Sequence, residues 1–560
     1  MKLEDLSKEQ LLEEIKKLKK RKKFGLVWEN KPEKVVEKCK TELPVLEEIK
    51  EREIYKKSGL SFNLLIEGDN YHALSVLNYT NAQNIDFIYI DPPYNTGARD
   101  WKYNNDYVDS TDTFRHSKWI SFMDHRLRIC KNLLKEEGVI CVTVDDYEMP
   151  KLWLLMESIF GEENHLGTVT IRNNPKGRMT QRKVSLVHEY ALFFGKSSKS
   201  FIKKLPVKPE EKTHKYILDE DGSWYVSVNL RKQGVDSNAT NKKGKLSDRY
   251  YPIYYSPKTG EVSVSEKLEI EILPIDMKGT KRIWRRGKDA IEEMFRNDEL
   301  WITETSNGFQ VYFKFRGGLK GESPKSIWYD AQFSASEHGT KTLDKILGAR
   351  EKFQYPKSPF AVKQSILCGT DNKDAVILDF FAGSGTTGQA VLELNREDGG
   401  NRKFILCTNN ENGIAEEVCY PRVKSVIEGY SDVEGIPANL KYFKTSFIPK
   451  SIVSDDTRTN IVNKSTEMIC IKEGTFEELF VSEGFKIFKN GTHTTAILFN
   501  LDCLDELKEK IQSVKLPSSI YVFSLSNDTY DQDFEDLSVE HELCPIPESI
   551  LEVYRKLFKD

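Results

Sequence analysis

The apolar run Ile85 to Ile90 ends in a carboxylate, two prolines and an aromatic residue, Asp91-Pro92-Pro93-Tyr94. The run predicts a buried strand, and paired prolines cannot continue its hydrogen-bond ladder. The rigid backbone that they impose suits chemistry on a nucleobase amine, whose lone pair is delocalised into the ring. Asp91 and the Pro92 carbonyl are placed to accept hydrogen bonds from its two N–H groups, and the Tyr94 ring is placed to stack on a flipped base. The tetrapeptide therefore predicts a catalytic site.

A second motif that could belong to a functional site is the glycine-rich stretch from Asp379 to Gly388, DFFAGSGTTG. It lies between an apolar run and a helical one. Glycine lets the backbone approach a ligand closely, and the N-terminus of the following helix favours a negative group such as a carboxylate. By itself the motif is a weak signal, because dinucleotide sites and plain tight turns use the same pattern.

Both motifs need strands to position them, and the chain supplies short apolar runs alternating with helical stretches. Buried parallel strands have this continuous apolar character. Alternating strands and helices predict an α/β fold, a doubly wound mixed, mostly parallel sheet. The predicted strands include FNLLIEGDN, IDFIYIDPP, GVICVTVDD, HEYALFFGK, DAVILDFF and RKFILCTNNE, and a long amphipathic helix is predicted over 114–136.

Residues 197–330 break this rhythm and predict an inserted domain of mixed structure. Between residues 171 and 290 there are 26 Lys and Arg against 14 Asp and Glu, although the whole chain has a formal charge of −4. A local basic surplus indicates a polyanionic partner. Cations interleaved with an aromatic residue suit contact with phosphates and bases, so the predicted DNA-binding residues are Arg282, Trp284, Arg285 and Arg286.

The predicted domain organisation has five parts, as expected for a chain too long for one hydrophobic core. A Ser/Asp/Thr/Asn-rich stretch after residue 450 is interpreted as a linker, and residues 7–22 predict a charged amphipathic helix. The five ranges are an N-terminal helical region (1–50), the catalytic half (51–196), the insert (197–330), the cofactor half (331–450) and a small C-terminal α/β domain (451–560).

Composition narrows the class of protein. Hydrophobic residues make up 39% and charged residues 30% of the chain, as in globular proteins, and no apolar run approaches the roughly 20 residues of a membrane span. The charged N-terminus lacks the apolar core of a secretion signal, so a cytoplasmic protein is expected. The nine cysteines are scattered without CxxC pairs or zinc-finger spacing, and no metal site is expected.

Taken together, Asp91 to Tyr94 and Phe381-Ala382-Gly383-Ser384-Gly385 resemble the catalytic and cofactor motifs of amino-methylating DNA methyltransferases. The catalytic motif comes first, and this permuted order resembles the beta class of adenine-N6 enzymes with a Rossmann-like class I fold. More closely, residues 24–195 and 325–430 resemble the Mod subunit of type III restriction-modification systems. The pieces that carry this resemblance are GLVWENKPE, IEGDNYHAL, IDPPYNTG, DHRLRICKNLL, HEYALFFGK, ASEHGTKTLDKILG, YPKSPFAVKQSIL, LDFFAGSGTTGQAV and FILCTNNE.

The resemblance implies S-adenosylmethionine as cofactor and assigns residues to it. Asp379, Gly383 and Gly385 would hold its methionine part, with Phe381 against its adenosine, and Ala382 in the same motif would also contact the cofactor. The remaining implied contacts are Lys357, Pro359 and Phe360 along the same pocket, Asp69 near the adenine ring and Glu411 at the ribose hydroxyls. The implied partners are double-stranded DNA, a second copy of the chain and an ATP-dependent restriction (Res) subunit.

The resulting expectation is site-specific methyl transfer to the N6 amine of adenine in duplex DNA, by direct transfer without a covalent intermediate. Cytosine N4 is the nearest alternative substrate, and Asp at the first position of the tetrapeptide favours adenine. An RNA or protein amine methyltransferase is a second alternative, disfavoured by the large basic insert, and a DNA-recognition module without activity is a third.

Overall fold

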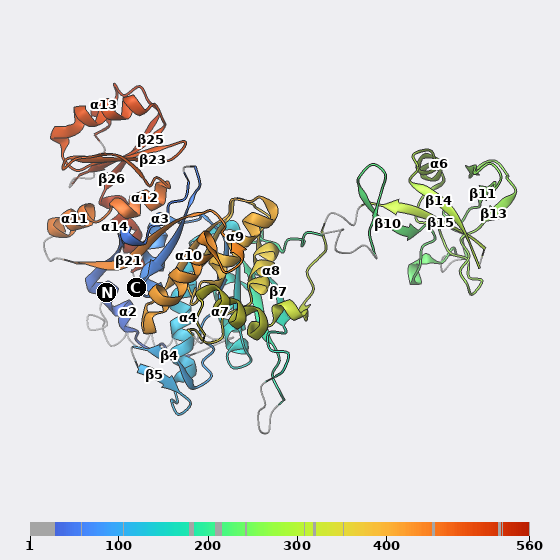
Figure 1. Ribbon diagram of the computed structural model, residues 1–560, viewed down its shortest axis with the longest axis horizontal. Helices are drawn as coiled ribbons and strands as arrows, with labels where there is room; N and C mark the ends of the chain where they lie inside the picture. The colour runs from blue at the N-terminus through green and yellow to red at the C-terminus, as the bar shows by residue number, and fades with distance from the viewer. Residues whose placement is uncertain are drawn as a thin grey trace, which may run out of the picture. The chain divides into compact units, whose positions relative to one another are not determined.

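The computed structural model (Figure 1) describes most of the chain. It forms two compact units, one of residues 1–203 and 325–560 and the other Lys204–Pro324. The residues described are 28–57, 59–104, 106–177, 184–207, 215–240, 244–306, 308–316, 321–350, 352–450, 454–524, 528 and 530–558. The helix predicted over 7–22 lies outside them.

The first unit is built on a ten-stranded sheet with the order β1-β21-β2-β18-β17-β3-β6-β8-β7-β16. Its strands from β21 to β6 are parallel to one another, while β1 and β8 run antiparallel to their neighbours. The strands, in that order, are Glu42–Glu48, Asn439–Pro449, Phe62–Glu67, Lys403–Thr408, Val376–Asp379, Ile85–Ile90, Leu134–Val144, Glu189–Gly195, His165–Ile171 and Ile327–Trp328. The prediction of a mixed, mostly parallel α/β sheet is confirmed.

Helices cover both faces of this sheet, because alternate residues of its buried strands point to opposite sides. In β3, Ile88 and Ile90 belong to the same core cluster as Leu74 of α3 and Leu127 of α4, whereas Phe87 lies against Gly369 of α8 on the other side. The first layer comprises α3 (Asn70–Thr80), α4 (Arg115–Lys131) and α5 (Met149–Phe160). The second comprises α8 (Pro359–Gly369), α9 (Thr386–Asp398) and α10 (Tyr420–Glu428), which lie together in Figure 1.

Shorter elements of the first unit lie around these layers. They are α2 (Lys34–Thr41), the hairpin β4 (Ala98–Tyr103) and β5 (Asp106–Asp109), the π-helical turn Ala335–Thr340 leading into α7 (Lys341–Leu347), the turns Glu411–Gly413 and Ile414–Cys419, and the short pair β19 (Gly429–Tyr430) and β20 (Val433–Glu434). Among the described residues, no helix combines the length and apolar character needed to cross a bilayer.

The described residues of the second unit form two small antiparallel sheets and one α-helix around their own core. Leu230, Trp284, Leu300, Val311 and Phe313 are among the buried residues of that core. The first sheet has the order β14 (Leu300–Thr305), β15 (Gly308–Phe315), β10 (Trp224–Asn229) and β9 (Ile217–Leu218); the second has β12 (Val262–Ser263), β11 (Ile253–Tyr255) and β13 (Ile270–Ile272); the helix is α6 (Lys288–Arg296).

The C-terminal residues form a five-stranded sheet that packs with the first unit. The interpretation of the stretch after residue 450 as a linker is wrong, since Ser454–Asn463 forms α11. Ile461 and Val462 explain this result, because both are buried in the core of the first unit. The further elements are α12 (Thr466–Glu473), β22 (Glu477–Val481), β23 (Phe485–Lys489), β24 (Thr494–Leu498), α13 (Leu504–Val514), β25 (Ser518–Phe523), β26 (His541–Ile546) and α14 (Glu548–Leu557).

Candidate active site

The two sequence motifs lie at the carboxyl ends of adjacent parallel strands. β3 ends at Ile90, directly before Asp91, and β17 ends at Asp379. The register pairs Ile377 with Phe87 and Leu378 with Ile88, which brings the two strand ends to the same edge of the sheet. In open α/β sheets, ligands bind outside the carboxyl ends of the strands. This edge is therefore the candidate active site.

The glycine-rich turn after β17 is held in place from both ends. The Asp379 carboxylate accepts hydrogen bonds from the Phe381 amide at 2.9 Å and the Thr387 hydroxyl at 2.5 Å. Gly383 and Gly385 have φ of 49° and 78°, a region that favours glycine. A Cβ atom on Gly383 would lie 3.1 Å from the Phe353 ring. Side chains at these two glycines would therefore strain the backbone of the turn, and one at Gly383 would crowd the Phe353 ring.

Asp379 is almost fully buried, and its environment determines its protonation. Burial raises the pKa of its carboxyl group to about 7, although the hydrogen bonds from Thr387 and Phe381 act in the opposite direction and the nearby charge of Asp91 adds to the rise. A positively charged ligand group placed beside Asp379 would favour its ionised form.

Asp69, which caps α3 by accepting from the Tyr71 amide, belongs to a buried ion network. Arg126 is fully buried and contacts Asp69 at 3.2 Å and Glu33 at 2.8 Å. The adjacent Asn70 side chain donates to the Phe380 carbonyl at 2.9 Å. The network therefore connects the cap of α3 to the glycine-rich turn after β17.

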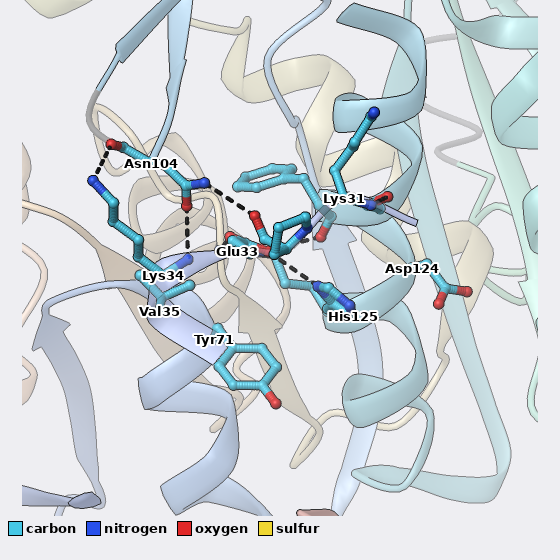
Figure 2. Close-up of polar contacts among 12 residues, drawn as sticks. Lys31, Glu33, Lys34, Val35, Tyr71, Asn104, Asp124 and His125 are labelled. Carbon is cyan, nitrogen blue, oxygen red and sulfur yellow. Dashed lines mark hydrogen bonds and ion pairs between the residues drawn. The ribbon is translucent and has the colours of Figure 1, made fainter. Parts of the chain in front are cut away.

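Glu33 lies in the segment before α2, which is fastened to the same region (Figure 2). Its carboxylate points toward His125, with an Oε2–Nδ1 distance of 3.1 Å, and the Asn104 side chain binds the backbone on both sides of it, at Pro32 and Lys34. Burial alone would raise the pKa of Glu33, but Arg126 and His125 outweigh burial and hold it below its ordinary value. Glu33 therefore stays ionised as the partner of Arg126.

The Asp91–Tyr94 segment is fixed by neighbouring side chains. The Thr143 hydroxyl of β6 donates to Asp91 Oδ1 at 2.7 Å, and the Trp119 indole donates to the Pro93 carbonyl at 2.7 Å. The Tyr94 hydroxyl lies 2.8 Å from the same Asp91 oxygen. Pro92 is buried directly after Asp91. A carboxylate and a backbone carbonyl in consecutive positions form an acceptor pair that matches the two N–H bonds of an amine.

Lys357, expected along the cofactor pocket, contacts the catalytic segment. Its Nζ atom lies 3.0 Å from Asp91 Oδ1 and also bonds the Tyr94 hydroxyl and the Glu189 carboxylate. Glu189 begins β8 and is 2% exposed. Burial pulls the pKa of Lys357 down, but Asp91 and Glu189 outweigh burial and raise it above its ordinary value.

The other predicted cofactor residues have varied surroundings. Phe381 packs against Phe122, and Ala382 is buried behind the turn. Pro359 starts α8, and Phe360 is 37% exposed beside His338. Glu411, just after β18, forms an ion pair with Lys102 of the β4–β5 hairpin.

In the second unit, the predicted DNA-binding residues 282 and 284–286 are only partly exposed to a ligand. Trp284 is 2% exposed in the core, and its indole donates to the Tyr251 carbonyl, so the expected contact of its ring with DNA does not fit its position. Arg282 is paired with Asp276 at 2.7 Å. Arg285 bonds the Asn229 carbonyl and is half-buried, while Arg286 is exposed.

Several residues at this edge were not assigned to the site from the sequence. Glu33, Arg126 and Thr143 are polar residues that are buried. Buried polar groups that are hydrogen-bonded to one another commonly support a site. These residues lie far apart in the sequence, so their common place in the structure cannot be recognised from it. Glu189 in HEYALFFGK does have a local signal, because it is a carboxylate at the start of an apolar strand.

Replacement of Arg126 by methionine tests the buried network. The change leaves the Glu33 carboxylate buried without its main partner. We therefore expect the protein to unfold at a lower urea concentration, with its free energy of unfolding reduced by about 3–5 kcal/mol. The matched control is Arg128→Met on the same helix, because Arg128 is 56% exposed and pairs with Asp124; its cost should stay below about 1 kcal/mol. Equal unfolding midpoints for the two variants would refute the network's structural role.

Comparison with known proteins places this site in a family. A family model described as DNA methylase (N6_N4_Mtase) matches residues 85–418. Type II methyltransferase M.KpnI from Klebsiella pneumoniae is 36% identical over 368 residues, covering 65% of this chain and 84% of that protein. The EcoPI Mod subunit of Escherichia phage P1 is 32% identical over 384 residues, and there the match spans 63% of this chain and 58% of the relative.

Among solved structures, PvuII DNA methyltransferase (cytosine-N4-specific) matches with 11% identity and a TM-score of 0.33, over 65% of this chain and 90% of that one. The family match carries more weight. It extends over more than half of the chain and includes both strand ends of the candidate site. The chain therefore belongs to the DNA methylase family.

Proposed function

We propose that this DNA methylase transfers a methyl group from S-adenosylmethionine to the N6 amine of adenine in duplex DNA, as the modification subunit of a type III restriction-modification system. The observation that carries the proposal is the adjacency of Asp91 and Asp379 at one edge of the sheet. One strand end offers acceptors for an amine, and the other offers a glycine-rich turn for a cofactor. Methyl transfer requires donor and acceptor to be aligned in this way.

The residues after β17 fit S-adenosylmethionine. Asp379 supplies a carboxylate for the cofactor's amino group, and the turn after it has left-handed backbone at Gly383 and Gly385, where it carries no side chain. Asp69 and Glu411 follow β2 and β18, the next strands along the same edge, where the adenosine part would lie. The cofactor supplies an electrophilic methyl group on a sulfonium, so the protein need not form a covalent intermediate.

At the amine, the Asp91 carboxylate and the Pro92 carbonyl accept hydrogen bonds from the two N–H groups, which draws the nitrogen lone pair out of the ring and toward the methyl group. A sulfonium cofactor held at Asp379 and the glycine-rich turn would supply the methyl group, and the electron pair of its S–C bond would return to sulfur as the amine nitrogen takes that methyl group. The methylated nitrogen then loses one proton to the Asp91 carboxylate that already accepts its hydrogen bond, and from there to solvent. Asp at this position favours adenine over cytosine N4.

The insert and the partners complete the proposal. Duplex DNA must be bound while one base is extruded, and the exposed Arg286 with its neighbour Arg285 offers positive charge for phosphates. The similarity to Mod subunits supports assembly with an ATP-dependent Res subunit. We further propose that the chain pairs with a second copy of itself, as the resemblance of its motifs to that family implies.

Replacing Asp91 with alanine tests the acceptor role. We expect transfer of labelled methyl from the cofactor to duplex DNA to fall by more than about a thousandfold, because the preorganised acceptor is lost, while affinity for the cofactor is retained. Digestion of DNA methylated by the wild-type protein should yield N6-methyladenine. Near-normal turnover of the variant would remove Asp91 from the mechanism. Recovery of N4-methylcytosine from the digested DNA would show that the substrate is the N4 amine of cytosine and not the N6 amine of adenine.

The pKa of Asp379, about 7, predicts a pH dependence of cofactor binding. Only the ionised carboxylate pairs with the cationic amino group, and the protonated fraction grows as pH falls through that pKa. We therefore expect roughly tenfold weaker binding at about pH 6 than at about pH 7.5 by calorimetry. Asp379→Asn should bind weakly at both values. An affinity of the native protein that is independent of pH would contradict this role.

Arg286→Ala tests the DNA contact of the insert. Loss of one phosphate contact should weaken binding to duplex DNA and lower the slope of log affinity against log salt by about 1. Arg296→Ala is the control, since Arg296 is exposed at the end of α6 in the same unit. A slope for Arg286→Ala that equals that of the wild type and of Arg296→Ala would contradict a phosphate contact at Arg286.

A further inference from the structure

The Asp91 carboxylate is bound unequally at its two oxygens. Oδ1 lies within hydrogen-bonding distance of three donors, at 2.7 Å from the Thr143 hydroxyl, 2.8 Å from the Tyr94 hydroxyl and 3.0 Å from the Lys357 ammonium. Among the described residues, Oδ2 has no hydrogen-bond partner. Because Thr143 and Lys357 already donate to Oδ1, and the Tyr94 hydroxyl lies beside it, an incoming amine finds its acceptor at Oδ2.

Glu189 holds the donors of this cluster from the other side. Its Oε2 atom accepts from the Asn173 side chain at 2.6 Å, lies 3.0 Å from the Tyr94 hydroxyl and bonds the Lys357 ammonium. Lys357 is 11% exposed and Glu189 2% exposed, counted on their side chains. A buried ammonium is costly without ionised partners, and Asp91 and Glu189 together supply them for Lys357.

We infer that Lys357 and Glu189 form a buried ion pair that positions the catalytic carboxylate, taking up Asp91 Oδ1 so that Oδ2 faces the target amine. This inference rests on the proposed function. It makes Lys357 a positioning residue of the amine site, in place of the cofactor contact expected from the sequence.

The charge balance of the cluster gives Glu189 a second role. With Lys357 alone, the ammonium would neutralise Asp91, whereas the two carboxylates and one ammonium together carry one net negative charge. Methyl transfer moves positive charge from the sulfonium to the amine nitrogen, next to this cluster. A net negative charge there favours the transition state, as preorganised charges do in general.

Removal of Lys357 should therefore create a pair of like charges. Asp91 and Glu189 would face each other without a cation, and proximity of two carboxylates raises the pKa of one of them. The other titratable groups around the cluster are Tyr94, Tyr89, Cys141 and Asp379. Burial raises the pKa of both tyrosines and of the cysteine well above their ordinary values, so they remain neutral, and Asp379 is common to every variant.

The test compares Lys357→Met, Glu189→Gln and the double variant in the full chain. The measurements are the dissociation constant of S-adenosylmethionine and kcat for duplex DNA at saturating cofactor, across pH. Lys357→Met should keep its cofactor affinity but lose kcat at low pH, with the acid limb of the profile shifted upward by about one pH unit or more. The double variant lacks the like-charge pair, so its acid limb should return to the wild-type position with a lower plateau.

Glu189→Gln supplies the matched comparison, because it removes the second negative charge while Lys357 stays. We expect a reduced kcat, unchanged cofactor affinity and an acid limb no higher than that of the wild type. A wild-type acid limb in Lys357→Met, or an acid limb in the double variant as high as in Lys357→Met, would overturn the inference. So would loss of cofactor affinity in both Lys357 variants with kcat preserved at saturation, the result for a cofactor contact.

These outcomes separate the inference from the proposed function. A wild-type protein that transfers no methyl group to duplex DNA overturns the proposed function and the inference with it. A wild-type protein that methylates DNA, with variants that show none of the expected pH shifts, overturns the inference alone.

Discussion

The structure depends on the alignment of two parallel strands, β3 and β17, whose carboxyl ends reach the same edge of one sheet. The two motifs are almost 290 residues apart in the chain, and only the hydrogen-bond register between these strands brings Asp91 near Asp379. The helical layers on both faces bury the strands, and that burial fixes the register. The proposed methyl transfer requires this register.

Around this edge the protein arranges charged groups in two networks, each centred on a largely buried cation, Arg126 or Lys357. One, Glu33–Arg126–Asp69, fastens the cap of α3 and, through Asn70, the glycine-rich turn. The other, Glu189–Lys357–Asp91, fixes the acceptor carboxylate. Each contains two carboxylates around one cation, so each retains negative charge in a poorly solvated region. A cationic cofactor and an amine that becomes cationic are suited to such surroundings.

The sequence allowed the sheet to be predicted because apolar runs and glycine-rich turns are local signals. It also allowed the Asp91–Tyr94 and Asp379–Gly385 motifs to be identified, since both are contiguous. The position of Lys357 could not be predicted, because its contacts with Asp91 and Glu189 depend on loops between distant strands. Trp284 was misread for a similar reason: a tryptophan among arginines suits DNA contact, but its ring fills the core of the insert. The helix at Ser454–Asn463 was missed because its polar composition outweighed the buried pair Ile461 and Val462.

The most direct test of the central claim is a crystal structure of the protein with a non-reactive cofactor analogue and duplex DNA. The account predicts that the atom replacing the methyl group lies within about 3–3.5 Å of an extruded adenine N6, between Asp91 and Asp379. A cavity of about 990 Å³ at the opposite, amino-terminal ends of the strands, lined by Phe62, Val376 and Lys403, offers a clear alternative location. An analogue bound in that cavity, or an extruded base held away from Asp91, would contradict the account.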